Sequence, residues 1–254
     1  MSEHPTRLNG HLVIGGASHD FDFVRLELLK LLAAYPHVRV TVAPNFEDLE
    51  GLAAADFLIA YTCNVEPGEA AQKALYDFVA SGKRWFALHG TNSVLEWSED
   101  GVAAPPRARR FMETLGSQFV AHPAMGPFDV EVTAPDHPLV AGLSAFETVD
   151  ELYLSDFFGE PEVLLATHYS GEAPGFVRDQ WPDNVPRPVL YLKKVGDGEV
   201  LYFTLGHRRG HWDAPHRTPY YPEVEEGSWA TPEFHEVLRR GIRWAARLDE
   251  GEQP

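Results

Sequence analysis

The stretch FLIAYTCNVEPGEAAQKALYDFVASGKRWFALHG, residues 57–90, decides the fold, because it predicts a strand, a helix and a second strand in succession. Phe57–Thr62 is short, continuous and apolar, which is typical of a strand covered on both faces. Pro67 suits the first turn of the helix, and Gly82 suits its C-terminal cap. Arg84–Gly90 predicts the next strand. Two strands joined in this way imply a parallel pair with a right-handed crossover.

The same alternation extends toward the N-terminus. His11–Gly16 predicts a strand that ends in glycine, and Val38–Val42 predicts another. Between them, apolar residues recur at helical spacing from Phe21 onward, and Asp20 is placed to cap that helix. Repeated strand–helix units predict an α/β fold, a three-layer sandwich with a mainly parallel central sheet.

The second half of the chain changes character and predicts added β-hairpins. Phe128–Val132 alternates apolar and polar residues. Val189–Leu192 and Val200–Phe203 flank a Gly-Asp-Gly turn at residues 196–198, which is a hairpin pattern.

Two further helices and one long loop complete the expected organisation. Pro105–Leu115 predicts a helix closed by Gly116, and a last helix is expected from Thr231 to Trp244. The segment between Thr204 and Thr231 is rich in Pro, His and Trp and is too long for a mere connection. We expect residues 1–254 to form a single domain.

Composition excludes several classes of function. Hydrophobic residues make up 44% of the 254 residues and charged residues 23%, enough for a sizeable core. The 38 acidic and 21 basic residues give a formal charge of −17, which disfavours nucleic acid and anionic membranes as partners. Most of the excess acid lies after residue 127. It predicts either a negatively charged rim over a ligand-binding cleft, which suits a neutral or cationic ligand better than a phosphorylated one, or plain solvated surface.

The cysteine count and the N-terminus predict a cytoplasmic protein. The single cysteine, Cys63, excludes an intrachain disulfide and any CxxC zinc or redox site. No leader-like or membrane-spanning apolar segment is apparent in the sequence. Cys63 itself follows a predicted strand, so it is either a small buried thiol, which we favour, or a nucleophile beside a histidine.

Three histidines are expected to meet at one edge of the sheet, because ligands of open parallel sheets bind beyond the carboxyl ends of the strands. His19, His89 and His207 each follow a predicted strand. Imidazoles gathered in this way bind a divalent, zinc-like metal or move protons near neutral pH. Each of them could equally be a hydrogen-bonded loop residue, since no HExxH, CxxC or His-x-His pattern accompanies them.

Paired carboxylates supply a second candidate group. Asp150 and Glu151 precede Tyr153, and a carboxylate buried beside aromatic rings can serve as an acid or base. The same two residues could instead cap or salt-bridge a turn. The candidate catalytic residues are therefore His89, Asp150 and Glu151.

Four tryptophans fall in predicted loops, where they suit stacking on a polyhydroxylated ligand. They would serve equally well to cover apolar surface or to form an interface in a homo-oligomer. The expected substrate-binding residues are Asp20, Asn92, His122, Tyr153 and Trp212. No nucleotide cofactor is expected, because Gly15-Gly16 lacks the GxGxxG spacing.

Short motifs spread along the chain resemble the ThuA-like, or trehalose-utilisation, family. They are Gly15-Gly16 with His19-Asp20, Ala87-Leu-His89-Gly90, Gly116-Ser-Gln-Phe119 with His122-Pro123, His137-Pro138 with Gly142, Asp150-Glu151-Leu-Tyr153, Gly196-Asp-Gly198 with Leu205-Gly206-His207, and Gly241-Ile-Arg-Trp244-Ala. The resemblance implies a flavodoxin-like core, a class I glutamine amidotransferase-like fold and a role in sugar metabolism. It further implies oxidised keto-glycosides as substrates, handled alongside a separate sugar dehydrogenase.

The amidotransferase relationship also carries a negative expectation. Glutaminases of that fold place a cysteine on a strand-to-helix turn of pattern G-x-C-x-G, with a downstream His and Glu. The corresponding residues here, Leu88-His89-Gly90-Thr91, contain no thiol. We therefore expect no glutamine hydrolysis.

Two functions from different classes remain open on the sequence. The first is an enzyme acting on a neutral sugar or keto-glycoside through a histidine and carboxylate cleft. The second is a non-catalytic module that binds a carbohydrate or a partner with the same cleft.

Overall fold

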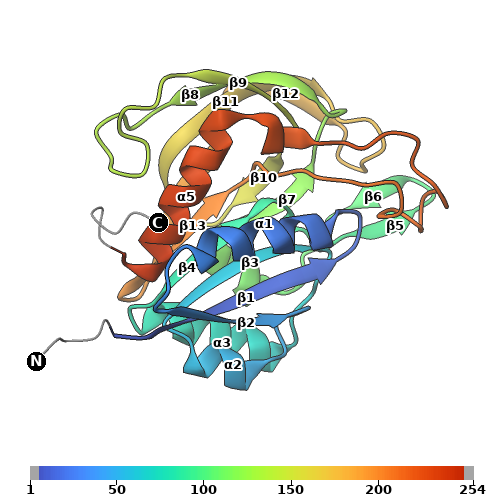
Figure 1. Cartoon of the computed structure of the whole chain (residues 1–254). Helices are drawn as coiled ribbons and strands as arrows, with labels where there is room; N and C mark the ends of the chain where they lie inside the picture. Colours follow the sequence, from blue (N-terminus) through green and yellow to red (C-terminus); the bar gives the residue numbers. More distant parts are fainter. Residues whose placement is uncertain (1–5, 249–254) are drawn as a thin grey trace, which may run out of the picture.

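A nine-stranded mixed sheet forms the centre of the computed structural model, which describes residues 6–248 (Figure 1). The strand order is β2-β1-β3-β4-β13-β12-β11-β8-β9. The five parallel strands are β1 (Leu8–Gly16), β2 (Val38–Ala43), β3 (Phe57–Cys63), β4 (Arg84–Leu88) and β13 (Gly198–Phe203). The remaining four are β12 (Gln180–Val195), β11 (Glu162–Glu172), β8 (Gly126–Val132) and β9 (Phe146–Asp150).

The expectation of a mainly parallel sheet is not confirmed. Four pairings in the described part of this sheet are parallel, and the other four are antiparallel. The reason is that the predicted hairpins do not stand apart from the sheet. β12 pairs along β13, which itself pairs with β4, so the hairpins of the second half extend the parallel half edge to edge.

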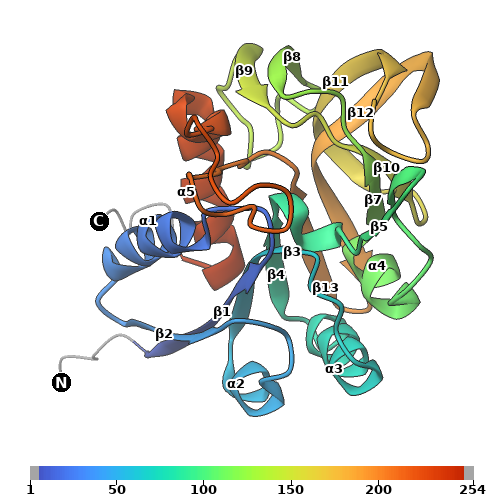
Figure 2. The same cartoon turned by 90° about the vertical axis from the view of Figure 1, so that its right-hand side faces the viewer.

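Helices cover both faces of the sheet, as expected for a three-layer arrangement (Figure 2). α1 (Phe21–Ala33) and α5 (Pro232–Ala246) lie on one face, and α2 (Leu49–Ala54), α3 (Glu69–Ala80) and α4 (Arg109–Leu115) lie on the other. Alternate residues of β3 serve the two layers: Ile59 packs with α1 and α5, whereas Leu58 and Ala60 pack with α2 and α3. This explains why the β3 sequence is continuously apolar.

The ends of the helices test the predicted caps. The Asp20 carboxylate accepts a hydrogen bond from the Phe23 N–H at 3.0 Å, so the cap of α1 is confirmed. Gly116, with φ of +88°, closes α4 as predicted. The start of α4 was predicted wrongly: Pro105 lies outside it because the next residue is also proline, which disfavours the helical conformation before it. Pro67 likewise precedes α3 instead of lying in its first turn.

Two small sheets and two short 3-10 helices lie near the carboxyl ends of the parallel strands. The sheets are β5 (Glu96–Ser98) with β6 (Gly101–Ala103) and β7 (Ser117–Ala121) with β10 (Leu154–Phe157). The 3-10 helices are η1 (His89–Asn92) and η2 (Gly227–Ala230). The long loop after β13 reaches the β5–β6 hairpin (Figure 1), where the rings of Trp97 and His216 lie 5.2 Å apart. Among the helices of residues 6–248, none has the length and apolarity needed to span a membrane.

Candidate functional site

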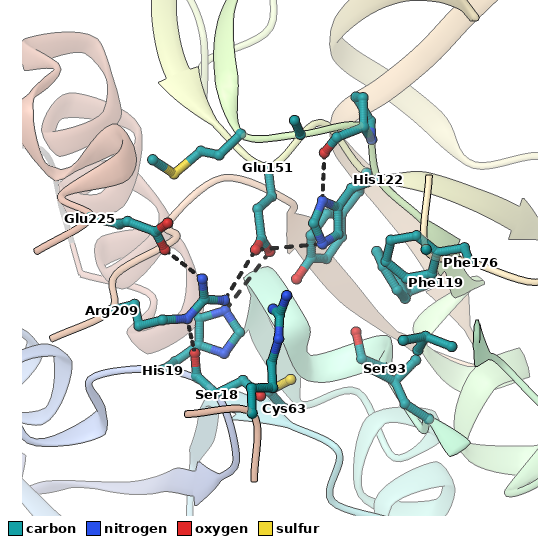
Figure 3. Close-up of a pocket in the computed structure, with 18 of the residues that line it drawn as sticks. Ser18, His19, Cys63, Ser93, Phe119, His122, Glu151, Phe176, Arg209 and Glu225 are labelled. Carbon is teal, nitrogen blue, oxygen red and sulfur yellow. Dashed lines mark hydrogen bonds and ion pairs between the residues drawn. The ribbon is translucent and has the colours of Figure 1, made fainter. Parts of the chain in front are cut away.

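A pocket of about 550 Å³ lies beyond the carboxyl ends of the parallel strands (Figure 3). His19 follows β1 and His89 follows β4, while His207 follows β13, so the parallel arrangement delivers the three histidines to one edge of the sheet. Glu151 arrives from the end of β9. The structure therefore brings together the three histidines that the sequence singled out and one of the two paired carboxylates.

These four side chains, the His/Glu cluster, are buried and converge on one point. Each offers one ligand atom, and these atoms all lie within 4.8 Å of one another. The Nε2 atoms of His19 and His89 are 2.9 Å apart. Glu151 approaches His89 Nε2 at 3.5 Å with one oxygen and His207 Nδ1 at 3.2 Å with the other.

The hydrogen bonds behind the cluster fix which ring nitrogens face it. His89 Nδ1 lies 2.8 Å from the carbonyl oxygen of Thr204, and His19 Nδ1 lies 3.3 Å from that of Ala17. A carbonyl only accepts, so each Nδ1 carries a proton and each neutral ring turns the lone pair of Nε2 inward. Two lone pairs at 2.9 Å repel each other unless a proton or a cation lies between them.

His207 is oriented by a carboxylate in the same way. Its Nε2 lies 2.9 Å from an Oε2 of Glu225, and its Nδ1 then faces Glu151. A metal-binding histidine commonly donates its other N–H to a carboxylate or a backbone carbonyl. All three histidines of the cluster have such a partner, so the donor set fits a divalent cation.

Burial and charge act on each group of the cluster differently. Burial, together with His89 and His207, lowers the pKa of His19 well below its usual value, which keeps that ring neutral. Burial alone would raise the pKa of Glu151, but His122 and His207 outweigh it and hold that pKa well below the usual range. Burial opposes a charge on His207, yet Glu151 and Glu225 raise its pKa to about 9. In the absence of a metal, His207 is therefore a charged imidazole at neutral pH.

The turn after β4 aims His89 at the cluster. His89 has a φ of +44°, in the left-handed region that few side chains adopt. Gly90 follows, and a Cβ at that position would lie 2.8 Å from the Thr62 carbonyl oxygen. The sequence His-Gly thus permits a sharp strand-to-helix turn in which the backbone of η1 packs against β3.

Asp150 lies behind the cluster and does not line the pocket that holds Glu151. Its carboxylate accepts hydrogen bonds from the N–H groups of Gly206 at 2.9 Å, His207 at 3.2 Å and Ser228 at 3.0 Å, and also from the Ser228 hydroxyl. The two adjacent acids, which the sequence grouped as catalytic, therefore have different surroundings. Asp150 holds the backbone that carries His207, whereas Glu151 faces the pocket.

The five expected substrate-binding residues divide in two. His122 and Tyr153 line the pocket, where His122 Nε2 is 3.5 Å from Glu151 and the Tyr153 hydroxyl is 3.2 Å from His89 Nε2. Asp20 caps α1 instead. Asn92 is fully buried, and its amide donates to Ser117 Oγ at 2.7 Å.

Trp212 also lies outside the pocket lining. It is 70% exposed, and its ring packs 5.1 Å from that of Tyr220 on the outer part of the long loop. A loop position in the sequence does not reveal which way a side chain points, and here the tryptophan that lines the pocket is Trp97.

The sequence interpretation did not assign a role in the site to several charged and aromatic residues of the pocket, among them Arg209, Glu225, Phe119 and Phe176. Arg209 lies 3.4 Å from Glu151 and 2.5 Å from Glu225, and it follows His207 by only two residues, which could have drawn attention to it. Phe119 and Phe176 form an aromatic wall beside His122 (Figure 3). Cys63 lines the floor, where burial raises the pKa of its thiol to about 12. It is thus a neutral thiol near pH 7, in agreement with the interpretation we favoured.

Comparison with known proteins places the chain among relatives. A family model described as ThuA, trehalose utilisation, matches residues 16–219. A ThuA-like protein structure from Bacteroides uniformis has a TM-score of 0.67 at 16% identity and covers 97% of this chain and 94% of its own. One from Parabacteroides merdae has a TM-score of 0.62 at 16% identity, covering 95% and 90%.

A third structure shows how far the fold extends beyond such proteins. A β-galactosidase from Rahnella sp. R3 has a TM-score of 0.56 at 14% identity, and the match covers 96% of this chain but 32% of that enzyme. No curated protein matches the chain. At these identities the solved structures show the fold alone, whereas the family model spans most of the sequence. The chain therefore belongs to the ThuA, or trehalose-utilisation, family.

Proposed function

We propose that this protein is an enzyme of carbohydrate metabolism that acts on a neutral sugar or keto-glycoside with the help of a divalent metal ion. Membership of the trehalose-utilisation family supports the carbohydrate context. The observation that carries the proposal is the His/Glu cluster, in which three imidazole nitrogens and a carboxylate oxygen lie within 4.8 Å of one another.

The chemistry of the donor set fits a zinc-like ion. Zinc is bound by imidazole nitrogen and carboxylate oxygen, and catalytic sites keep a position open toward the substrate. His19, His89, His207 and Glu151 would hold the ion, and two of them, His19 and Glu151, line the pocket. When bound, the ion would polarise a carbonyl or hydroxyl oxygen of the substrate.

His122 is placed to move a proton in this pocket. Its Nδ1 lies 2.6 Å from the carbonyl oxygen of Pro123, so its Nε2 faces Glu151 and the pocket. Its side chain is 24% exposed, so a substrate can reach it, unlike the fully buried ring of His89. In this proposal Glu151 is a ligand, and His122 carries the proton during an isomerisation, hydration or elimination next to a carbonyl.

Tyr153 would orient the substrate oxygen. Burial and the nearby Glu151 raise the pKa of its hydroxyl well above the usual value, so it remains a hydrogen-bond donor at neutral pH. It is 3.2 Å from His89 Nε2 and lines the pocket. A metal ion would occupy that lone pair, and the hydroxyl would then be free to donate to the substrate.

Metal analysis of protein purified without a histidine tag tests the proposal. We expect about one divalent ion per chain, which is lost in His19→Ala and in His207→Ala because each removes one ligand. His168→Ala is the matched control, because His168 is on β11 and outside the pocket lining.

The alternative function gives a different result. A non-catalytic binding module would bind sugar without turnover and without metal. Wild-type protein that contains no divalent ion and takes up none on dialysis against zinc, while still binding sugar, would contradict the metal-assisted enzyme and favour the module.

A further inference from the structure

The lining of the pocket contains a closed ring of contacts, and the two halves of this ring differ in chemistry. One half runs from Glu151 to Arg209 at 3.4 Å, and from Arg209 Nε to the Ser18 carbonyl oxygen at 2.9 Å. It continues from Ser18 Oγ to His216 Nε2 at 3.2 Å. Every contact on this half joins polar groups.

The other half is built from apolar residues. His122 meets the ring of Phe176 at 4.9 Å, Phe176 forms a β-bridge with Val102, and Val102 pairs with Trp97 across the β5–β6 hairpin. Trp97 then closes the ring against His216. Figure 3 shows the division, with Arg209 and Glu225 on one side of Glu151 and Phe119 and Phe176 on the other.

The apolar half, as described in the structure, offers few side-chain hydrogen-bonding groups, and Ser93 is a hydroxyl residue on that side of the pocket (Figure 3). The apolar residues of the pocket lining are Leu95, Trp97, Val102, Phe119, Pro123, Ala124, Met125, Pro174, Gly175 and Phe176. The indole N–H of Trp97 is the one polar side-chain group in that set. A hydroxyl removed from water at such a wall loses its hydrogen bonds without replacement, which lowers affinity.

The aromatic wall is placed to contact the part of a substrate that does not react. The His/Glu cluster and His122 define where the reacting carbon lies, and the aromatic wall begins at His122 and leads away from the cluster. A sugar bound with its hydroxyls toward Arg209, Glu151 and Ser18 would therefore direct its substituent onto Phe176 and Trp97. A second sugar ring at that place would present several hydroxyls to a surface with few groups to pair them.

We propose that the preferred substrates carry an apolar, planar aglycone, an aryl group, and not a second sugar, and that Trp97 and Phe176 determine this specificity. The inference rests on the proposed function only in taking the ligand to be a glycoside. Aromatic faces in offset or edge-on contact favour an aryl ring. The substrate class is then aryl glycosides in oxidised or neutral form.

Binding of matched probes to the full chain tests the inference without requiring turnover. The probes are phenyl and methyl glucosides of both anomers and the disaccharide trehalose, titrated by calorimetry against zinc-loaded and chelator-treated protein. We expect the phenyl glucoside of the preferred anomer to bind at least tenfold more tightly than the methyl glucoside and than trehalose. Trp97→Ala should reduce this ratio to less than threefold, with little change for the methyl glucoside.

Trp212→Ala is the matched control, because this exposed tryptophan is outside the pocket lining and should leave the ratio unchanged. Phe176→Leu, which removes a ring but keeps an apolar side chain, should lower the ratio as well and provides a second variant if Trp97→Ala fails to fold. Trehalose binding as tightly as the phenyl glucoside would overturn the inference, and so would equal losses for phenyl and methyl glucosides in Trp97→Ala.

Failure of this inference can be told apart from failure of the proposed function. Protein that contains the metal but shows no aryl preference overturns the inference alone. An aryl preference in protein that takes up no metal supports the inference and contradicts the metal-assisted enzyme. Absence of binding by every phenyl glucoside also overturns the inference, whatever the metal content.

Discussion

His207 lies between two carboxylates, and its two ring nitrogens face Glu151 at 3.2 Å and Glu225 at 2.9 Å. In metal-free protein this places a buried positive charge between two negative ones. Such an arrangement makes the stability of the protein depend on pH, because the two carboxylates favour the protonated ring only in the folded state.

The direction of that dependence follows from the pKa of His207, about 9 in the folded protein against an ordinary value of 6.5. The stabilisation is fully present below pH 6.5 and is lost as the pH rises through about 9. We expect chelator-treated protein to lose about 3 kcal/mol of unfolding free energy between pH 6.5 and 9. The low pKa of His19 acts below this window, whereas ionisation of Cys63 in unfolded chains, where the ordinary thiol pKa is 9.0, begins at its upper end. Urea unfolding at several pH values measures the loss.

A matched pair of variants checks the cause. Glu225→Gln removes one of the carboxylates that raise the pKa of His207, so the pH dependence should become shallower. Glu223→Gln changes an exposed acid on the same loop and should leave the slope unchanged. Equal slopes in wild type and Glu225→Gln would show that the His207–Glu225 contact does not govern this pH dependence.

Individual residues were predictable from the sequence where a strand end fixed their position. We could place His19, His89 and His207 together because the carboxyl ends of parallel strands meet at one edge of the sheet. Glu151 was identified as one of two adjacent acidic residues that precede Tyr153. Asp150 and Trp212 could not be placed in this way. The backbone N–H groups that bind Asp150 come from distant residues, and the direction of Trp212 depends on how the long loop folds.

At the scale of secondary-structure elements, the end of β9 serves as an anchor. The Asp150 carboxylate holds Gly206 and His207, which follow β13, and Ser228 in η2. Thr148 on the same strand reaches Thr231 Oγ1 at 2.9 Å, at the start of α5. One short strand thereby fixes both ends of the long loop relative to the sheet.

Asp150→Asn should weaken this anchor. The amide nitrogen cannot accept a hydrogen bond, so buried N–H donors lose their partner, and we expect a loss of about 3 kcal/mol of unfolding free energy. Metal affinity should fall with it, because His207 is held through its own N–H. Thermal and urea unfolding, together with zinc titration, measure the two effects.

Asp129→Asn serves as the control, since Asp129 is an exposed acid on β8, the strand paired with β9. An Asp150→Asn protein that unfolds like wild type and binds metal normally, yet has lost all turnover, would point instead to direct proton transfer by Asp150.

Strands could be predicted from the sequence more reliably than their partners. The parallel core was visible because continuous apolar runs alternate with helices, as in residues 57–90. The pairing of β8, β9 and β11 could not be predicted. An alternation of apolar and polar residues identifies a half-buried strand, but it does not identify the strand next to it. β5 and β6 were not predicted, because each strand is only three residues long and every residue of β5 is exposed.

For the whole molecule, the strand-to-helix turn after β4 bears on the expectation that this protein is not a glutaminase. The turn carries His89, with φ of +44°, at the position where the resemblance to glutamine amidotransferases would require a cysteine. Cys63, the one thiol in the sequence, has a pKa of about 12 and is a poor nucleophile at neutral pH. We expect no ammonia release from glutamine by the wild-type protein. Release that is abolished in His89→Ala but retained in His168→Ala would contradict this assignment.

The distribution of charge also differs from the acidic rim expected at the cleft. The lining of the pocket contains two carboxylates, Glu151 and Glu225, and two guanidinium groups, Arg209 and Arg217. In a chain of formal charge −17, this balance sets the pocket apart from the rest of the surface. A divalent ion would make it positive, which favours the negative charge that develops on a substrate oxygen next to a reacting carbon.

The bridge between Arg209 and Glu225 separates the long loop from the residues of the reactive centre. Their backbones exchange hydrogen bonds at 3.0 and 2.9 Å, and their side chains pair, so residues 210–224 form an excursion closed at its base. His207, Arg209 and Glu225 keep their places whatever the length of that excursion, which carries His216 to the pocket mouth. Exchange of the excursion between homologues is thus a route by which selection or an engineer can alter ligand preference without rebuilding the reactive centre.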